Sequence, residues 1–568
     1  MTVNLMHCLR RAGCVRTWIS CATLRPPVRF LTIPPGTASN GRGVVGAGLL
    51  LLGAAGGLAV YHFRLHQTAA CTQKQEKRVR AGHVIQGLPE FSLKDVAKHK
   101  TKETGIWVTF GDGVYDITEF LHQHPGGSDK IILAAGSSIE PYWAVFGAHN
   151  TDEVREILEE LRIGNIALED RGKKTTTKRE GPYANDPERS PVLKVNTREP
   201  FNAETPPLLL TESFLTPNDI FFVRNHLPVP QVNAESYVLK ISGEGMDSVN
   251  LSLNDLKTKF PKHTVTVTIQ CAGNRRMDLA NMKPVKGIPW TGGAIGNAQW
   301  SGAYLRDVLL SAGLRLESGV QHIHIEGLDT NPLTGEHYGA SIPIEKAMDP
   351  RGDCLLAYEM NGGEIPRDHG YPVRAIVPGI VGARNVKWLG RIVASKEEYG
   401  GFWQQRDYKG FSPSVNWDTV DFSSAPAIQE LPVQSLICLP QDGTVVPEGE
   451  KDLTLSGIAW SGGGRAIIRV DVSVDGGRSW HVADLNEGTQ QERGKAWAWT
   501  FWNATVPLPP HRGELEVCCK AVDLSYNVQP DTSAPIWNLR GCLSNAWHRI
   551  HITTSRNSSV VEAQGQVH

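Results

Sequence analysis

The stretch VTIQCAGNRRMDL, residues 267–279, places one cysteine at the end of an apolar run and two adjacent arginines a few residues later. The letters HTVTVTIQ, residues 263–270, are rich in β-branched side chains and predict a buried strand that ends at Cys271. A cysteine that only packs in a core needs no cations beside it, and core packing is the simpler interpretation of a single cysteine. A thiolate is also a soft ligand for transition metals, so a metal site is the alternative.

The composition limits the class of protein. A chain of 568 residues is too long for one hydrophobic core and predicts three or four domains. The 57 glycines and 35 prolines favour turn-rich β structure over helical bundles. A formal net charge of −1 offers no general attraction for nucleic acid, so no nucleic-acid partner is expected. The 10 cysteines include no Cys-x-x-Cys pair, which argues against zinc ribbons, thioredoxin motifs and c-type haem attachment.

The N-terminal residues have the composition of a targeting segment. Residues 1–75 contain several arginines and no Asp or Glu, which is typical of a mitochondrial presequence. Residues 43–63, GVVGAGLLLLGAAGGLAVYHF, are apolar and about long enough to span a bilayer. We interpret residues 1–82 as a mitochondrial presequence with an apolar sorting segment and predict the intermembrane space. A retained membrane anchor is the alternative.

The next two segments form a compact unit and a linker. Within residues 83–168, IWVTFGDGVYDI (106–117) predicts two strands around a tight turn, and EVREILEELRIGN (153–165) predicts an amphipathic helix. Residues 169–194 are charged and lack apolar periodicity over most of their length, which predicts a flexible linker. About 20 such residues have a typical reach of roughly 25 Å.

The remaining chain divides into a mixed unit and an all-β unit. Residues 195–428 combine strand patterns with helical ones such as SGAYLRDVLLSAGL (301–314), which predicts a mixed α+β domain. Residues 429–552 show strand patterns alone. In AIIRVDVSVDGGRSW (466–480), Ile468, Val470, Val472 and Val474 alternate before a DGG turn, which predicts a hairpin with one buried face. The expected fold class is therefore multidomain α+β with an immunoglobulin-like sandwich, followed by a polar tail at 553–568.

The first compact unit contains a histidine pair. FLHQHPGGSDKIILAAGSS (120–138) holds His124 before Pro-Gly-Gly, and His149 follows 25 residues later. Two imidazoles from opposite sides are what a six-coordinate iron porphyrin needs. The stretch resembles the cytochrome b5 family over residues 83–166. This resemblance implies a small α+β domain in which His124 and His149 ligate haem b and pass single electrons, whereas His122 points elsewhere.

Charge is unevenly distributed in the same unit. Residues 83–168 contain 13 acidic and 7 basic residues, a net charge of −6, and five of the acids cluster within residues 152–160. Two interpretations remain open. The cluster is either a solvated helix face or a docking patch for a basic electron acceptor, which electrostatic complementarity would steer into place.

The central unit is rich in arginine within apolar, glycine-rich sequence. Arg224 lies in FFVRNHLPVP (221–230), and further cations lie in HGYPVRAIVPGIVGARNVKWLG (369–390). Arginines in such surroundings suggest bound oxyanions, which they match bidentately. QCAGNRR, FFVRNHLPVP, GYPVRAIVPG and GARNVKWL together resemble the sulfite oxidase family of molybdenum enzymes. The resemblance covers residues 83–552 and includes the order of the domains.

This resemblance implies a reaction and its cofactors. It implies oxidation of sulfite to sulfate by oxygen-atom transfer at a molybdenum–molybdopterin centre, with electrons leaving singly through haem to cytochrome c. It also implies a homodimer formed through residues 429–552. Cys271 corresponds to the thiolate ligand of molybdenum. The cofactor-lining residues would be Phe222, His226, Cys271, His369, Arg374 and Lys387.

The same resemblance implies a pocket for the substrate anion. The residues that would form it are Arg224, Arg276, Trp290, Tyr408 and Arg540. Cys271, Tyr408, Arg224 and Arg276 make up the expected catalytic set. Arg275 and Arg391 are expected to form surface ion pairs and are left out of the site.

Two other functions fit parts of the pattern. Nitrate reductase shares the molybdenum domain, but it places its haem unit after that domain and adds a flavin–nicotinamide reductase; here the haem unit comes first, and no G-x-G-x-x-G motif follows residue 428. A membrane-tethered haem carrier, whose other domains only bind partners, would contain iron and no molybdenum.

Overall fold

The computed structural model describes residues 81–554 except 126, 146–148, 173–180, 448 and 511–512. Nearly all of the predicted presequence, including residues 43–63, and the tail from residue 555 lie outside the described residues. Among the described residues, no helix has both the length and the apolar character that a membrane-spanning helix requires.

Residues 81–172, the N-terminal group, form a five-stranded sheet with short helices. The strand order is β1-β5-β4-β3-β2. The two strands predicted around Gly111 are confirmed as β3 and β4, and Gly111 takes a positive φ of 55° in the turn between them. The elements are β1 (Glu90–Phe91), α2 (Leu93–Val96), β2 (Lys100–Thr101), β3 (Gly105–Phe110), β4 (Gly113–Asp116), η1 (Glu119–Gln123), α3 (Ser128–Ile131), η2 (Ile132–Ala134), α4 (Glu140–Val145), α5 (Asp152–Glu160) and β5 (Arg162–Ile166).

The helix predicted over residues 153–165 is shorter than expected. Helix α5 ends at Glu160, and the chain continues as strand β5. Strand β5 lies between β1 and β4, so its backbone groups pair with both neighbours. A side chain at Gly164 would meet the Pro89 carbonyl oxygen at 2.5 Å, so the absence of a Cβ allows this close pairing. Sheet pairing therefore overrides the helical periodicity of the last residues.

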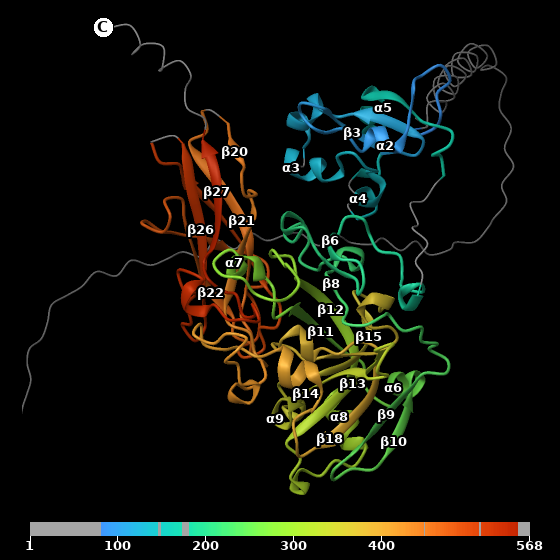
Figure 1. Ribbon diagram of the computed structural model, residues 1–568, viewed down its shortest axis with the longest axis vertical. Coiled ribbons are helices and arrows are strands. Elements are labelled where there is room, and N and C mark those ends of the chain that lie inside the picture. The colour runs from blue at the N-terminus through green and yellow to red at the C-terminus, as the bar shows by residue number, and fades with distance from the viewer. Residues whose placement is uncertain are drawn as a thin grey trace, which may run out of the picture. The chain divides into compact units, whose positions relative to one another are not determined.

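Residues 181–433, the central group, contain three sheets and four short α-helices (Figure 1). The sheets have the orders β10-β9-β18-β13-β14, β11-β12-β15-β16 with β17 paired to β15, and β6-β7-β8. The mixed α+β character expected here is confirmed. The elements are β6 (Lys194–Thr197), β7 (Asn202–Glu204), β8 (Val223–Arg224), β9 (Val238–Gly243), β10 (Val249–Ser252), α6 (Leu253–Thr258), β11 (His263–Gln270), α7 (Arg276–Ala280), β12 (Ile295–Tyr304), α8 (Leu305–Ser311), β13 (His322–Thr330), β14 (His337–Pro343), α9 (Ile344–Met348), β15 (Leu355–Met360), β16 (Gly363–Glu364), β17 (Arg374–Ile376) and β18 (Leu389–Ser395).

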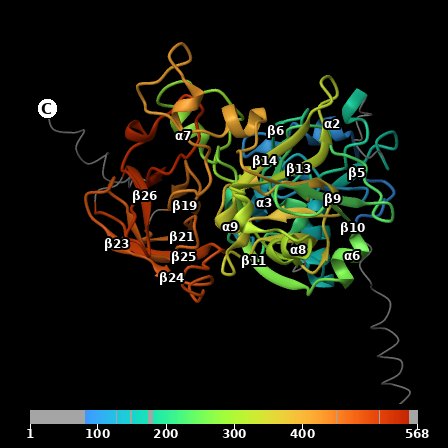
Figure 2. The same ribbon diagram turned by 90° about the horizontal axis from the view of Figure 1, so that it is seen from below.

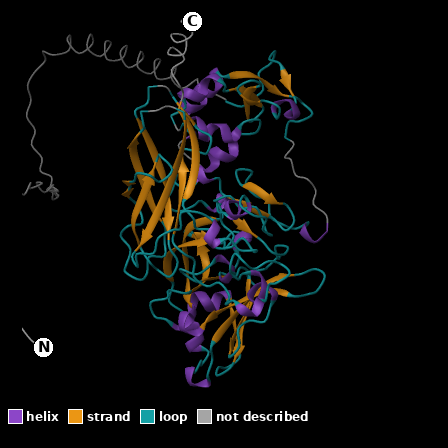
Figure 3. Ribbon diagram, turned by 60° about the vertical axis from the view of Figure 1, so that its left-hand side comes forward, coloured by secondary structure: helices purple, strands orange, loops and turns teal. Residues whose placement is uncertain are grey.

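Residues 434–554, the C-terminal group, form a sandwich of two sheets, as expected. One sheet has the order β19-β21-β25-β24 and the other β20-β27-β26-β22-β23. Figure 2 shows both layers from below, and in Figure 3 this part of the ribbon consists mainly of strands and the loops that join them. The strands are β19 (Gln434–Leu439), β20 (Val445–Val446), β21 (Asp452–Trp460), β22 (Ile467–Ser473), β23 (His481–Val482), β24 (Asp484–Leu485), β25 (Thr500–Pro507), β26 (Glu514–Asp523) and β27 (His548–Thr554).

One residue of the predicted hairpin face lies on the other side. Strands β22 and β23 pair as predicted, and Val470, Val472 and Val474 are buried. Ile468, in contrast, is 36% exposed, and Ile467 is buried in its place. A register shift between residues 467 and 469, where β22 meets β26, inverts the alternation at the start of the strand. The prediction for Ile468 is therefore wrong.

The central and C-terminal groups share part of one hydrophobic core. Leu436, Ile458, Trp460 and Trp499 of the sandwich belong to the same buried cluster as strands β9, β13 and β18. The sandwich also has a separate core between its own sheets, which includes Leu455, Val470 and Val517. The two groups are thus packed together where the candidate site lies.

The separate core of the sandwich yields a stability prediction. Val470 is fully buried, so Val470→Ala removes two buried methyl groups and should lower the free energy of unfolding by about 2 kcal/mol. Val482→Ala is the matched control because Val482 is 70% exposed, and it should change the value by less than about 0.5 kcal/mol. Urea unfolding followed by tryptophan fluorescence measures both; equal losses would contradict this assignment of the core.

Candidate functional site

Two histidine rings face each other in the N-terminal group. The ring centroids of His124 and His149 are 6.0 Å apart and the ring planes differ by 6°. A metal bonded to one nitrogen of each ring at about 2 Å fits between rings at this separation. The Nδ1 atom of His124 lies 2.9 Å from the carbonyl oxygen of Gly127. Because a carbonyl only accepts, Nδ1 carries the proton and Nε2 keeps its lone pair for a metal.

His122 does not join this pair. Its Nε2 lies 3.1 Å from the Lys102 ammonium group at the exposed surface. The structure therefore brings together the two histidines predicted as haem ligands and leaves the third elsewhere, as expected. Two facing imidazoles fit an iron porphyrin that is ligated on both sides.

The acidic cluster of helix α5 serves more than one purpose. Glu159 accepts hydrogen bonds from Tyr115 and from the backbone of Gly82, and it pairs with Arg162, whose side chain is buried. Glu159 is thus part of the fold. Asp152, Glu153, Glu156 and Glu160 are exposed and remain available to a partner.

Cys271 lies at the end of strand β11, as predicted. Its amide donates to the Ala294 carbonyl oxygen, and its carbonyl accepts from Asn274. A side chain at Gly382 would meet the Gln270 carbonyl oxygen at 2.8 Å, so this glycine lets the turn that precedes Lys387 approach the end of β11. Two distant segments therefore meet beside the sulfur.

A cavity of about 60 Å³ opens at this point. It is lined by eight of the predicted site residues, which come from segments spread over more than 180 positions of the sequence. These are Phe222, Arg224, His226, Cys271, His369, Arg374, Lys387 and Tyr408. The cofactor-lining residues expected from the sequence thus all meet at one cavity.

The cavity carries buried positive charge. The guanidinium group of Arg374 donates to the carbonyl oxygens of His369 and Asn385, and its Nε has no partner among the described residues. Burial lowers the pKa of Arg374 to about 9 and also lowers the pKa of Lys387. A bound anion would offset this cost, because buried cations need a counter-charge.

One carboxylate in the cavity was missed by the sequence reasoning. Asp329 lies near the end of the alternating strand β13, a pattern that indicates a sheet and gives no sign of a ligand. Burial raises the pKa of Asp329, and its Oδ1 has no hydrogen-bond partner in the described part of the chain. An unpartnered buried oxygen, beside an unpartnered Arg374 nitrogen, fits a ligand that has both donors and an anionic group.

Tyr408 and His226 form a pair at the wall of the cavity. The Tyr408 hydroxyl lies 2.6 Å from Nε2 of His226. Burial, together with the positive charges of Arg224 and Lys387, lowers the pKa of His226 well below its usual value, so the ring is neutral at pH 7. Burial raises the pKa of Tyr408, so the phenol keeps its proton. The pair therefore holds a neutral hydroxyl beside Arg224.

Three predicted substrate residues do not line the cavity itself. The Arg276 guanidinium donates to the carbonyl oxygens of Ile288 and Gly541, and Trp290 is fully buried nearby. Arg540 forms an ion pair with Asp407, the residue before Tyr408. Burial and the neighbouring charges of Arg276 and Arg224 lower the pKa of Arg540. The three arginines are therefore close enough to repel one another, and one of them comes from the C-terminal group.

The two arginines left out of the site behave differently from each other. Arg391 forms an exposed ion pair with Glu326, as expected. Arg275 does pair with Asp278, but its side chain is almost fully buried and donates to the Ala546 carbonyl oxygen of the C-terminal group. The expectation of a surface position for Arg275 is wrong because its partner lies 271 residues away in the sequence.

Comparisons with known proteins agree with this arrangement. Three family models match: the cytochrome b5-like heme/steroid binding domain at residues 92–167, the oxidoreductase molybdopterin binding domain at 226–403 and the Mo-co oxidoreductase dimerisation domain at 425–555. Mitochondrial sulfite oxidase of Rattus norvegicus is 58% identical over 81% of this chain and 84% of that protein. The Homo sapiens protein of the same name is 55% identical over 85% of this chain and 87% of that protein.

A solved structure supports the fold. The sulfane dehydrogenase SoxCD of Paracoccus pantotrophus matches with a TM-score of 0.53 and 27% identity, covering 67% of this chain and 92% of that chain. The cavity beside Cys271, the facing histidine pair and the identity to relatives over most of the chain lead to one conclusion: the chain belongs to the sulfite oxidase family.

Proposed function

We propose that this protein oxidises sulfite to sulfate at a molybdenum–molybdopterin centre and passes the electrons singly through haem b to cytochrome c. The observation that carries the proposal is the cavity in which the Cys271 sulfur lies beside buried cations, in the same chain as a facing histidine pair. The first arrangement suits an anionic cofactor and an anionic substrate, and the second suits electron transfer.

Different residues around the cavity hold different parts of the cofactor. The Cys271 sulfur is the soft ligand for the metal. His369, Arg374 and Lys387 hold the pterin and its phosphate, and Phe222 and His226 complete the wall. When bound, the molybdenum–molybdopterin group supplies the oxygen atom that sulfite gains and accepts two electrons, and haem b carries these electrons onward one at a time.

The substrate anion is held by Arg224, Arg276 and Arg540, with Trp290 behind them. Guanidinium groups keep their charge and bind oxyanions bidentately, so their positions select an anion of sulfite size. The Tyr408 hydroxyl, kept protonated by burial, donates a hydrogen bond to an oxygen of the anion, and His226 orients the phenol. The carboxylate of Asp407 restrains Arg540 until the anion arrives.

His124 and His149 would hold the haem iron, and the haem would then carry electrons without binding oxygen or substrate. The exposed acids of helix α5, Asp152, Glu153, Glu156 and Glu160, present negative charge to a basic acceptor such as cytochrome c. The C-terminal sandwich, which matches a dimerisation model, pairs with a second copy of the chain.

We assign the protein to the mitochondrial intermembrane space. The acid-free, arginine-containing N-terminal residues followed by the apolar stretch at 43–63 support this assignment. The relatives from Rattus norvegicus and Homo sapiens carry mitochondrial in their names. The domain limits at residues 83, 169, 195, 429 and 553 are part of the same proposal.

Sulfite should reduce the haem of the cofactor-loaded protein. The absorption bands of haem are expected to shift to those of the reduced form on anaerobic addition of sulfite and to return when cytochrome c is added. Cys271→Ser should slow this reduction at least about 100-fold, because loss of a metal ligand costs more than loss of an outer partner. Cys354→Ser, at a buried cysteine away from the cavity, is the control. An unchanged haem spectrum in loaded wild-type protein, or full speed in Cys271→Ser, would refute the proposal.

Arg276→Gln should weaken sulfite binding. The variant loses a fixed positive charge beside Arg224 and Arg540, so kcat/KM for sulfite is expected to fall about 100-fold, chiefly through a higher KM. The haem spectrum should not change, because the histidine pair is untouched. Arg391→Gln removes an exposed arginine and should leave both constants unaltered. A KM and kcat equal to those of wild type would exclude Arg276 from the substrate pocket.

A further inference from the structure

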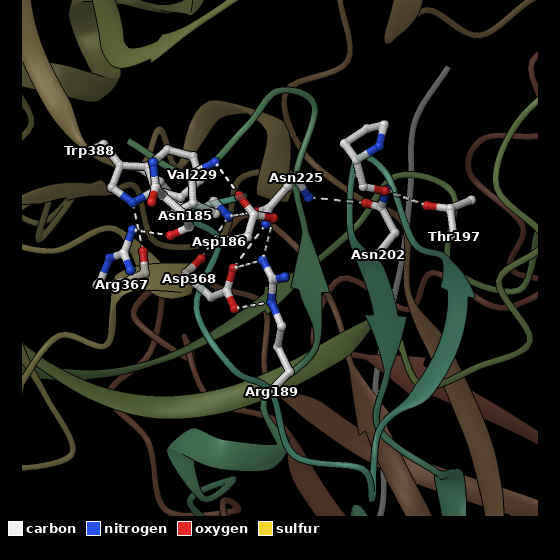
Figure 4. Close-up of polar contacts among 12 residues, drawn as sticks. Asn185, Asp186, Arg189, Thr197, Asn202, Asn225, Val229, Arg367, Asp368 and Trp388 are labelled. Atoms are coloured by element: carbon white, nitrogen blue, oxygen red, sulfur yellow. Dashed lines mark hydrogen bonds and ion pairs between the residues drawn. The ribbon is translucent and has the colours of Figure 1, made fainter. Parts of the chain in front are cut away.

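A buried ion pair joins the end of the predicted linker to the edge of the cavity. Arg189 donates from Nε to Oδ2 of Asp368 at 2.7 Å and from Nη2 to Oδ1 at 2.9 Å (Figure 4). The side chains are only 5% and 8% exposed. Two parallel bonds between buried partners define the position of each group closely. Residue 189 was expected to belong to a flexible, solvated segment, so this burial needs a physical reason.

Further contacts fix Arg189 in place. Its Nη2 also pairs with Asp186 at 2.9 Å, and Asp186 accepts a hydrogen bond from the backbone of Val229. The guanidinium lies 4.2 Å from the ring centroid of Phe201. Arg367 donates to the carbonyl oxygen of Asn185. Residues 185–189 are therefore held against the rest of the central group by several separate hydrogen bonds and ion pairs.

Asp368 connects this ion pair with the cavity. It precedes His369, and its Oδ1 accepts a hydrogen bond at 3.0 Å from Asn225, the residue between Arg224 and His226. The Lys387 ammonium group donates to Asn225 Oδ1 and, at 2.7 Å, to the backbone carbonyl oxygen of Asp368. Asp368 is thus bonded to Asn225 and Lys387 and is next to His369 in the sequence, so it is connected to three segments that line the cavity.

The charges in this network explain why an arginine is needed. Burial alone would raise the pKa of Asp368, but the hydrogen bonds and charge of Arg189 outweigh it and hold this pKa below its usual value. Asp368 is therefore a buried anion, and Lys387 is the next cation that acts on it. Without Arg189, the buried Asp368 carboxylate would keep Lys387 as the strongest remaining cation acting on it, and a buried anion that lacks its partner is costly.

We propose that Arg189 is a positioning residue of the cofactor cavity: by neutralising Asp368, it leaves the charge of Lys387 available to the anionic cofactor and keeps Asn225 and His369 in place. This inference rests on the proposed function, since it takes the cavity beside Cys271 as the cofactor site. Its effect is on cofactor retention, through Lys387, and not on the chemistry of sulfite.

The ratio of molybdenum to iron in the purified full-length protein tests the proposal without an activity assay. Haem iron is the internal reference, because the histidine pair lies outside the network. Arg189→Met should lower the ratio about tenfold, the smaller of the losses found when a partner behind a metal site is removed. Arg189→Lys should keep an intermediate ratio, since it restores the charge with fewer hydrogen bonds.

The double variant Arg189→Met/Asp368→Asn separates the electrostatic role from a structural one. It lacks the ion pair but also lacks the carboxylate that captures Lys387, so the molybdenum ratio should return to within about twofold of wild type. Arg465→Met, which removes an ion pair to the buried Asp523 in the sandwich, controls for a general loss of stability and should keep the wild-type ratio.

Two results would overturn the inference: a wild-type ratio in Arg189→Met, or a double variant as depleted as Arg189→Met. If Arg189→Met does not fold, the molybdenum-to-iron ratios of Arg189→Lys and of the double variant are compared instead. The ratio should be lower in Arg189→Lys than in the double variant. Wild-type protein that takes up iron but no molybdenum would instead reject the proposed function. If wild-type protein contains molybdenum and Arg189→Met has the same ratio of molybdenum to iron, the inference is rejected and the proposed function is unaffected.

Discussion

The structure at the centre of this protein depends on positively charged side chains that are buried away from water. Arg374 and Arg384 are buried and Lys387 is half-buried, all within residues 374–387, and burial lowers the pKa of each. Backbone carbonyl oxygens hold these cations in position, because a carbonyl accepts hydrogen bonds without cancelling a full charge. An anion that enters the cavity would offset part of the cost of burying the cations. Anion binding is thus built into the fold of the central group.

The C-terminal sandwich is part of the site as well as a separate layer. Arg276, which follows the Cys271 turn, donates to the carbonyl oxygens of Arg540 and Gly541, and Arg540 pairs with Asp407 beside Tyr408. Arg275 adds a buried bond to Ala546. Two neighbouring arginines therefore fix the sandwich against the turn after Cys271, and a chain without the sandwich would lack Arg540 and its ion pair with Asp407.

The sequence predicted the parts of the site that belong to contiguous motifs. Cys271, His369, Arg374 and Lys387 lie in short stretches of distinctive composition, and the structure places them at one cavity. Asp329 could not be found in this way, because the strand that contains it shows only sheet alternation. The partner of Arg275 is distant in the sequence, so its burial was not predictable from local pattern.

Predictions of secondary structure failed where pairing between strands decides the outcome. Ile468 is exposed because of a bulge between β22 and β26, and residues 162–165 form a strand because β1 and β4 flank them. Both effects depend on a neighbour that periodicity within one segment does not reveal. The mixed and all-β classes of the central and C-terminal groups, which depend on many residues at once, were predicted correctly.

The fastening of residues 185–189 has a mechanical consequence. A pull along the chain from the N-terminal side of residue 185 meets the Arg367–Asn185, Asp186–Val229 and Arg189–Asp368 bonds before it reaches the rest of the central group. The load is shared among these bonds before it reaches strand β8 and the residues beside Cys271.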